Sequence, residues 1–162
     1  MPEITVVLHN IRSTHNVGSI FRTAEGFGIS KIILSGYTPY PTVPGDTRLP
    51  HIREKLTSQI HKTALGAETM VPFEYTETLQ LGTLQLAGYR LVALEQSPRS
   101  VMLSDYTPPQ KIALLLGEEV HGIEPAVLDQ CQDIIEIPMR GKKESFNVSV
   151  AAAIAMYTLT RP

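Results

Sequence analysis

The stretch Ile112–Glu119, with the sequence IALLLGEE, decides the class of fold. Its five consecutive aliphatic residues leave no polar position for a water-facing side, so they predict a strand that is buried on both faces. Strands of this kind belong to parallel sheets, whose ligands lie at the carboxyl ends of the strands. We therefore expect an α/β protein with polar chemistry directly after residue 116.

Similar short apolar runs recur along the 162 residues and alternate with segments of helical spacing. This alternation predicts a single domain, residues 1–162, built as a mostly parallel sheet with helices on both faces. The expected strands are Ile4–Leu8, Lys31–Leu34, Glu68–Phe73, Arg90–Leu94, Ile112–Leu116 and Asp133–Ile137. The expected helices are Asn16–Phe27, Ile52–Leu65, Thr76–Leu86, Glu124–Cys131 and Phe146–Leu159.

The composition excludes several classes of protein. No run approaches the ~18 apolar residues of a membrane span, and the N-terminus lacks the layout of a signal peptide, so we expect a cytoplasmic protein. The net charge of -2 offers no overall attraction for RNA phosphates. Cys131 is the single cysteine and is expected to be a small core residue. The five histidines show no zinc-ligand spacing, and we expect no metal.

One long irregular stretch, residues 35–50, contains four prolines and two glycines. These residues exclude a regular helix or a central strand there. A loop of this length is either functional or a surface excursion, and the sequence leaves both interpretations open.

The first predicted strand runs into a polar stretch, residues 9–18, that opens a helix carrying Arg22. Asn16 is a good N-cap for that helix, and an arginine almost two turns further on is unremarkable if it is solvated. The segment is therefore either a helix entrance or one side of a site.

The strand Ile112–Leu116 is followed by Glu118 and Glu119, with glycines on either side of the pair. Glycine lets the backbone approach a ligand closely, and two carboxylates after an aliphatic strand suggest polar groups held at the sheet end. The plainer interpretation is a helix entry, with Glu124 and Pro125 in the first turn and the other carboxylates solvated.

The last predicted strand is followed by the densest basic cluster of the chain, Arg140, Lys142 and Lys143. Three cations on a loop either contact phosphates or are merely solvated. Ser145 or Asn147 caps the final helix or takes part in a site. The small residues of that helix permit close packing and favour an interface.

Other constellations are excluded. Gly26-Phe27-Gly28 lies at the end of a helix rather than after a strand, which rules out a Rossmann phosphate loop, and no Walker sequence occurs. The Gly-x-Ser-x-Gly elbow of serine hydrolases is also missing.

Three segments together resemble the SpoU/TrmH-like RNA 2'-O-methyltransferases, which belong to the SPOUT superfamily of class IV methyltransferases. Residues 10–24 resemble motif 1, residues 116–123 resemble motif 2, and residues 137–153 resemble motif 3. The motifs come in the order of the family, and the resemblance covers essentially the whole chain. Jointly they are highly specific, although each alone is not.

The resemblance implies a parallel α/β sheet with a C-terminal deep trefoil knot, and a homodimer that completes each active site. It implies an enzyme that transfers a methyl group from S-adenosylmethionine to a ribose 2'-hydroxyl of RNA. The implied cofactor contacts, made mainly by backbone groups of the knot, are Leu94, Gly117, Ile137, Met139 and Ser145. The implied catalytic set is Asn16, Arg22, Glu119, Ser145 and Asn147.

Arg22 is the family's candidate for assisting removal of the hydroxyl proton. Because arginine is normally always charged, an electrostatic and positioning role fits its chemistry better than that of a base. Asn16 and Glu119 are then expected to hold Arg22 and the substrate, while Ser145 and Asn147 shape the loop beside the cofactor.

The sequence offers six cations for RNA contact. Many relatives carry an additional RNA-binding domain that these 162 residues do not contain, so we expect tRNA rather than rRNA as the substrate. Two alternatives are methylation of an RNA base by the same fold and a non-catalytic RNA-binding module. The presence of Asn16, Arg22 and Ser145–Asn147 argues against base methylation and against a non-catalytic module. The candidate RNA contacts are Arg12, Arg48, Arg53, Arg140, Lys142 and Lys143.

Overall fold

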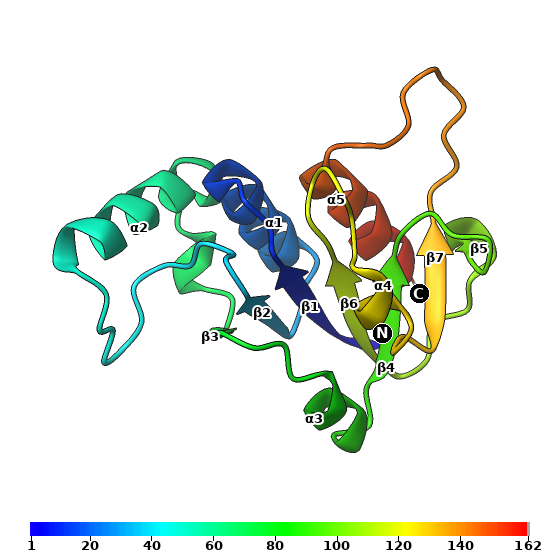
Figure 1. The fold of residues 1–162 in the computed structure, drawn as a ribbon, viewed down its shortest axis with the longest axis horizontal. Coiled ribbons are helices and arrows are strands. Elements are labelled where there is room, and N and C mark those ends of the chain that lie inside the picture. The colour runs from blue at the N-terminus through cyan, green and yellow to red at the C-terminus, as the bar shows by residue number, and fades with distance from the viewer. Residues whose placement is uncertain (162) are drawn as a thin grey trace.

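The computed structural model of the chain describes residues 1–161, and its centre is one parallel sheet. Seven strands of the described chain pair in the order β3-β2-β1-β6-β4-β7-β5, all in parallel (Figure 1). The predicted parallel α/β class is therefore confirmed. The strands are β1 (Glu3–His9), β2 (Lys31–Ser35), β3 (Phe73–Thr76), β4 (Arg90–Leu94), β5 (Val101–Met102), β6 (Lys111–Leu116) and β7 (Asp133–Glu136).

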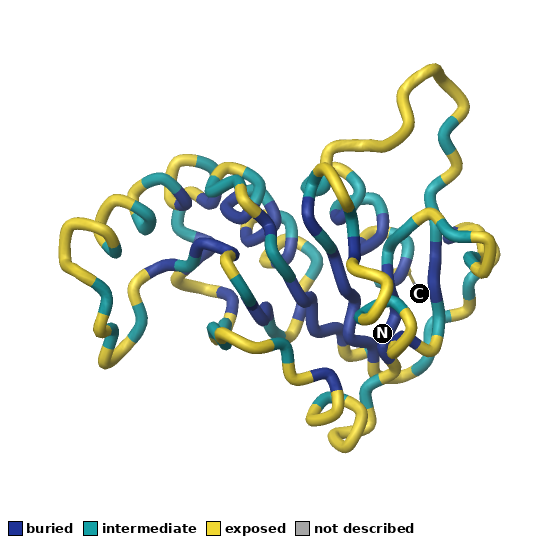
Figure 2. Tube along the Cα trace, viewed as in Figure 1, coloured by how far each residue is buried: buried dark blue, intermediate teal, exposed yellow. Residues whose placement is uncertain are grey.

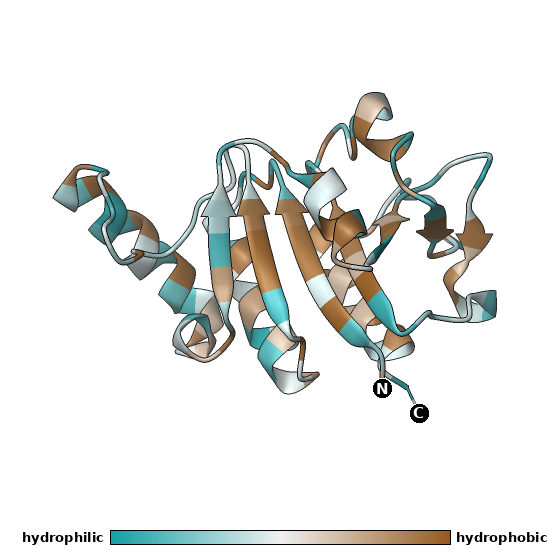
Figure 3. Ribbon diagram, turned by 90° about the horizontal axis from the view of Figure 1, so that it is seen from below, coloured by the Kyte–Doolittle hydropathy of each residue, from teal (hydrophilic) through white to brown (hydrophobic). Residues whose placement is uncertain are grey.

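Helices cover both faces of the sheet, as the alternating pattern predicts. One buried cluster joins β1 and β6 to Phe21, Ile60 and Met156 of α1, α2 and α5. A second cluster on the opposite face includes Leu81 of α3 and is flanked by Val127 of α4. The central strands β1, β6 and β4 between them are mostly buried and apolar (Figures 2 and 3). The helices are α1 (Thr14–Gly26), α2 (Pro50–Ala64), α3 (Leu81–Leu86), α4 (Pro125–Leu128) and α5 (Val148–Leu159), with 3-10 turns η1 (Ala67–Thr69) and η2 (Leu103–Asp105).

The predicted strand Glu68–Phe73 is wrong. Residues 67–69 form η1, in which the buried Glu68 carboxylate pairs with His61 and accepts the N–H of Gly66 at 2.9 Å. The strand begins only at Phe73, after Pro72, and it pairs with β2 through Thr76. A buried glutamate with local partners therefore replaces the strand that the apolar neighbours suggested.

Several helix boundaries also differ from the prediction. The helix expected over Thr76–Leu86 begins at Leu81, because Thr76 is still paired in the sheet. The helix expected over Glu124–Cys131 is the short α4, and the final helix begins at Val148 because Asn147 is its N-cap. Strand β5 has two residues, too few to produce a sequence pattern.

Two further observations concern the chain as a whole. Burial raises the pKa of the Cys131 thiol to about 11, so it is protonated at neutral pH. Within residues 1–161, no helix has the length and apolar character that a membrane crossing requires.

The packing of α1 against α2 places the first polar loop. A side chain at Gly18 of α1 would meet the backbone oxygen of Ile60 at 2.2 Å, so only glycine allows the two helices to approach this closely. Thr63 of α2 donates to the carbonyl oxygen of His15 at 2.8 Å, immediately before Asn16. The contact holds the start of α1 at the carboxyl edge of the sheet.

Candidate active site

The loop after β1 and the turn after β6 are joined by the carboxylate of Glu119. It accepts the backbone N–H of Arg12 at 3.1 Å and that of Ser13 at 3.2 Å. It also accepts from the side-chain amide of Asn16 at 3.3 Å. The parallel register, in which Leu8 lies beside Leu116, brings these distant segments to the same edge.

Asn16 does not cap α1, contrary to the plainer interpretation of the sequence. Ser13 is the N-cap, and its hydroxyl accepts the backbone N–H of Asn16 at 3.2 Å. The side chain of Asn16 is thereby free to bridge. Its oxygen accepts from the amide of Asn147 at 3.2 Å, which adds the third loop to the assembly.

The turn that follows β6 is closed by its own backbone. Glu118 and Gly122 exchange two backbone hydrogen bonds, of 3.1 and 2.8 Å. A side chain at Gly117 would meet the backbone of Gly122 at 2.6 Å, and one at Gly122 would meet the Glu95 carboxylate at 2.1 Å. These glycines are therefore required by the turn itself.

Glu118 is buried inside this turn, with 7% of its side chain exposed. Its Oε2 accepts the backbone N–H groups of Val120, at 3.1 Å, and His121, and these bonds with the nearby Arg12 lower the pKa of Glu118. Its Oε1 faces Nε of Arg12 at 3.2 Å as an ion pair and accepts no hydrogen bond from residues 1–161. Two consecutive carboxylates thus hold Arg12: Glu119 binds its backbone N–H, and Glu118 pairs with its guanidinium group.

A cavity of about 220 Å³ lies between the loops after β4, β6 and β7. It is lined by apolar side chains of these strands and by the turn of residues 117–122. All five positions that the resemblance assigns to the cofactor line it, namely Leu94, Gly117, Ile137, Met139 and Ser145. Glu119 also lines this cavity. The hydrogen-bonded group of Glu119, Asn16 and Asn147, which joins the three loops, is therefore at the rim of the cavity.

Arg22 lies away from this rim. It follows Asn16 by six residues, which in a helix means about 9 Å along the axis and about 120° around it. The side chain is exposed and forms no hydrogen bond or ion pair with another residue of 1–161. A single copy of the chain therefore brings together Asn16, Glu119 and Asn147, with Ser145 in the cavity wall, but not Arg22.

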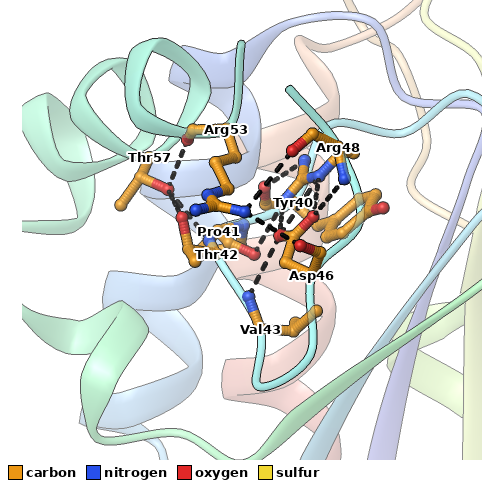
Figure 4. A network of polar contacts seen from close by, with 8 residues as sticks. All are labelled: Tyr40, Pro41, Thr42, Val43, Asp46, Arg48, Arg53 and Thr57. Carbon is orange, nitrogen blue, oxygen red and sulfur yellow. Dashed lines mark hydrogen bonds and ion pairs between the residues drawn. The ribbon is translucent and has the colours of Figure 1, made fainter. Parts of the chain in front are cut away.

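Two of the predicted RNA contacts are engaged inside the loop 35–50 (Figure 4). Arg48 pairs with Asp46 at 2.5 Å and donates to the backbone oxygen of Tyr40 at 3.0 Å, with 17% of its side chain exposed. Arg53 donates to the backbone oxygen of Asp46 at 2.8 Å. Both guanidinium groups organise the loop, and the pairing holds the pKa of Asp46 far below its usual range.

The other four predicted RNA contacts are exposed. Arg12 is 62% exposed above Glu118. Arg140, Lys142 and Lys143 lie in a run of exposed residues, 140–147, and none of them forms an ion pair with the described chain. This run projects beyond the sheet between β7 and α5 (Figure 2).

The sequence analysis assigned no individual role to two residues of this edge, although His9 opens the polar stretch of residues 9–18. Glu95 accepts the N–H of Ile123 at 3.0 Å, and His9 contacts the Ser35 hydroxyl at 2.9 Å. Burial lowers the pKa of His9. Each follows a predicted strand directly, and that position was the available signal. Within residues 1–161 no cluster of His, Cys, Asp and Glu has a geometry suited to a metal ion.

The fold and this edge define a class: an open parallel α/β protein with a ligand cavity at the carboxyl ends of its strands. The model of the SpoU rRNA Methylase family matches residues 3–44 and 46–157. The chain therefore belongs to the SpoU methylase family, and the resemblance read from the three motifs is confirmed.

Relatives and solved structures agree with this family. The chain is 28% identical over 99% of its length to the 23S rRNA (guanosine-2'-O-)-methyltransferase RlmB of Coxiella burnetii, and covers 59% of that protein. It is 28% identical over 96% of its length to a tRNA (guanosine(18)-2'-O)-methyltransferase of Borreliella burgdorferi, covering 65%. An AdoMet-bound rRNA methyltransferase from Sinorhizobium meliloti superposes with a TM-score of 0.79, at 25% identity, over 97% of this chain and 55% of the other. The chain thus spans less than two thirds of each.

Proposed function

We propose that the chain transfers the methyl group of S-adenosylmethionine to a ribose 2'-hydroxyl of RNA. One observation carries the proposal: Asn16, Glu119 and Asn147, each from a different motif, are in contact at the rim of a cavity. Two relatives named as guanosine 2'-O-methyltransferases, and the AdoMet-bound neighbour, support the reaction and the cofactor.

The walls of the cavity suit this cofactor. Leu94, Leu116, Ile137 and Met139 offer apolar surface for an adenine ring, while the backbone of the loops and the Ser145 hydroxyl offer polar contacts. When bound, S-adenosylmethionine supplies an electrophilic sulfonium methyl group. We also propose that residues 137–147 and α5 form a knot, and that the loop of this knot encloses the cofactor site.

The rim residues position the substrate. Glu119 fixes the loop of residues 12–16, so the amide of Asn16 has a defined place to meet a ribose or phosphate oxygen. A ribose hydroxyl is a poor nucleophile, and it must lose its proton while it attacks in line. Arg22 stabilises the developing oxyanion and holds the adjacent phosphate by its charge.

Arg22 reaches this rim from a second copy of the chain, which makes the active unit a homodimer. Helix α5 carries a stripe of exposed apolar side chains, formed by Val150 and Tyr157, which are seven residues apart. Their side chains are 46% and 51% exposed, and the exposed Phe146 precedes them. Two of the alanines of this helix, Ala152 and Ala155, are buried within the chain and do not belong to this stripe. A contact of more than ~1,200 Å² is expected for a stable pair.

Two experiments test the proposed cofactor and the proposed homodimer. Calorimetry on metal-free protein should show binding of S-adenosylmethionine and S-adenosylhomocysteine without RNA, and no binding at millimolar ligand would remove the methyltransferase proposal. Sedimentation at micromolar concentration should give a dimer, and a monomer would contradict the placement of Arg22.

RNA in the cytoplasm is the proposed substrate, with tRNA ahead of rRNA. The exposed cations Arg12, Arg140, Lys142 and Lys143 give a small positive footprint that suits a compact RNA. Competition between tRNA transcripts and rRNA fragments for labelled methyl transfer tests the preference. Faster methylation of an rRNA fragment would reverse it.

A further inference from the structure

A second cavity, of about 580 Å³, opens between residues 12–15 and residues 36–40. We name it the tyrosine cleft, after Tyr37, Tyr40 and Tyr75 in its lining, which also includes Arg12, His15 and Arg48. A smaller cavity of about 230 Å³ adjoins it, since both are lined by Tyr37. That smaller cavity shares Glu118, His121 and Gly122 with the proposed cofactor site. The three hollows therefore form one series along the carboxyl edge of the sheet.

The two walls of the tyrosine cleft are pinned to each other. The buried Thr38 hydroxyl accepts the N–H of Ile11 at 3.0 Å, and it lies 3.0 Å from the backbone oxygen of Leu8. This one side chain ties the loop after β2 to the loop after β1. The cleft is thus formed in advance and needs little rearrangement to receive a ligand.

The back wall is a stack of flat groups. The rings of Tyr40 and Tyr75 are stacked with centroids 3.9 Å apart, and the Arg48 guanidinium lies 3.5 Å over Tyr40. Asp46 anchors Arg48 in this position (Figure 4). The Tyr75 hydroxyl donates to the backbone oxygen of Gly36 at 2.6 Å, which supports the residue just before Tyr37.

An unusual backbone conformation at two neighbouring positions keeps the side chain of Tyr37 exposed. Asn10 and Gly36 both adopt positive φ, 58° and 66°, and the Asn10 side chain accepts the N–H of Tyr37 at 3.1 Å. A side chain at Gly36 would meet that Asn10 oxygen at 1.9 Å. A left-handed conformation at a residue other than glycine costs free energy. Yet the residue that it places, Tyr37, is 55% exposed rather than part of the core.

We propose that the tyrosine cleft binds an unpaired nucleotide of the RNA substrate, adjacent to the methylated one, with its base stacked on Tyr37. Exposed aromatic rings with neighbouring guanidinium groups are the platform on which proteins stack single-stranded bases. The exposed Arg12 beside the cleft meets the phosphate. Because residues 12–15 line the cleft and precede Asn16, a strand in the cleft continues directly to the rim of the cofactor cavity.

This proposal rests on the proposed function, and kinetics separate the two. Tyr37→Ala should raise KM for an RNA transcript that the wild type methylates by about 10-fold, the scale of one lost base stack. We expect kcat and the dissociation constant of S-adenosylmethionine to stay within about 2-fold. Tyr37→Phe should keep the wild-type KM. Leu86→Ala, which removes a 92% exposed apolar side chain on α3, is the control.

A binding measurement tests the cleft without catalysis. The chain has no tryptophan, so Tyr37→Trp introduces a single fluorescent reporter that is itself a stacking platform. The single-stranded oligoribonucleotide r(A)10 should quench its emission, and a blunt RNA duplex should not. Emission unchanged by r(A)10 up to millimolar concentration, or a wild-type KM in Tyr37→Ala, would overturn the proposal. If the wild type methylates no RNA, the proposed function fails, and the quenching result alone decides the cleft.

Discussion

The side-chain amide of Asn147 donates a hydrogen bond to Oδ1 of Asn16 at 3.2 Å, across 131 positions of the chain. Asn16 continues the series by donating to Glu119 at 3.3 Å. One polar chain therefore joins the loops after β1, β6 and β7. Each member depends on the others for its orientation, so substitutions at this edge should act on more than one loop.

Glu119 has the largest number of side-chain hydrogen bonds in that chain. Glu119→Ala leaves the N–H groups of Arg12 and Ser13 and the Asn16 amide without their acceptor. We expect a loss of about 1 to 3 kcal/mol in the free energy of unfolding, measured by urea denaturation. Glu74→Ala, at an exposed surface ion pair, is the control and should change stability by less than about 1 kcal/mol. Equal stability of the two variants would contradict the bridging role.

The turn after β6 should not tolerate a side chain at Gly122. Its φ of 71° and the 2.1 Å approach to Glu95 both oppose alanine. Gly122→Ala should lose about 2 kcal/mol or more of stability, together with S-adenosylmethionine binding. Gly141→Ala, where a side chain meets nothing within 4 Å, should behave as wild type in both measurements. Normal cofactor binding by Gly122→Ala would show that the turn does not shape the cavity.

Acid should weaken the same turn through Glu118. Its pKa in the folded chain is lowered from the ordinary 4.5, chiefly by the N–H of His121. The charged form therefore stabilises the fold above the ordinary value, and this contribution is lost as pH falls through the lowered pKa. As pH falls below the ordinary value, the wild type should lose more stability than Glu118→Gln. Parallel pH profiles in thermal unfolding would refute this.

Arg22 separates chemistry from cofactor binding, because it lies on α1 outside the cavity. Arg22→Ala should keep S-adenosylmethionine affinity within a few-fold while methyl transfer falls by ~100-fold. Arg22→Lys should recover little activity if the planar guanidinium is needed for phosphate, and most of it if charge alone suffices. A fully active Arg22→Ala would shift the catalytic role to Asn16 or Glu119.

The sheet was predictable because buried parallel strands are continuous apolar runs, as in residues 112–116. The segment 68–73 failed because a buried glutamate with local partners looks the same as a short strand in sequence. The start of α1 was placed two residues late because Asn16 and Ser13 are both good caps, and only the structure shows which of them bonds to the backbone.

The candidate site was predictable only through motifs taken together. Asn16, Glu119 and Asn147 are far apart in sequence, and their contact follows from the register of β1 against β6, which local periodicity does not contain. Arg48 looked like a free cation because its partner Asp46 is two residues away in an irregular loop. Tyr37 gave no signal, since its exposure depends on the positive φ of Asn10 and Gly36.

Methyl transfer to a ribose 2'-hydroxyl is the reaction that we propose for this chain. Its most direct test is to incubate the protein with unmodified RNA transcripts and methyl-labelled S-adenosylmethionine, digest the RNA to nucleosides, and identify the labelled product by mass spectrometry. We predict a 2'-O-methylnucleoside whose label stays on the sugar when the glycosidic bond is broken. Label on the released base, or no label on RNA while S-adenosylmethionine binds normally, would contradict the account.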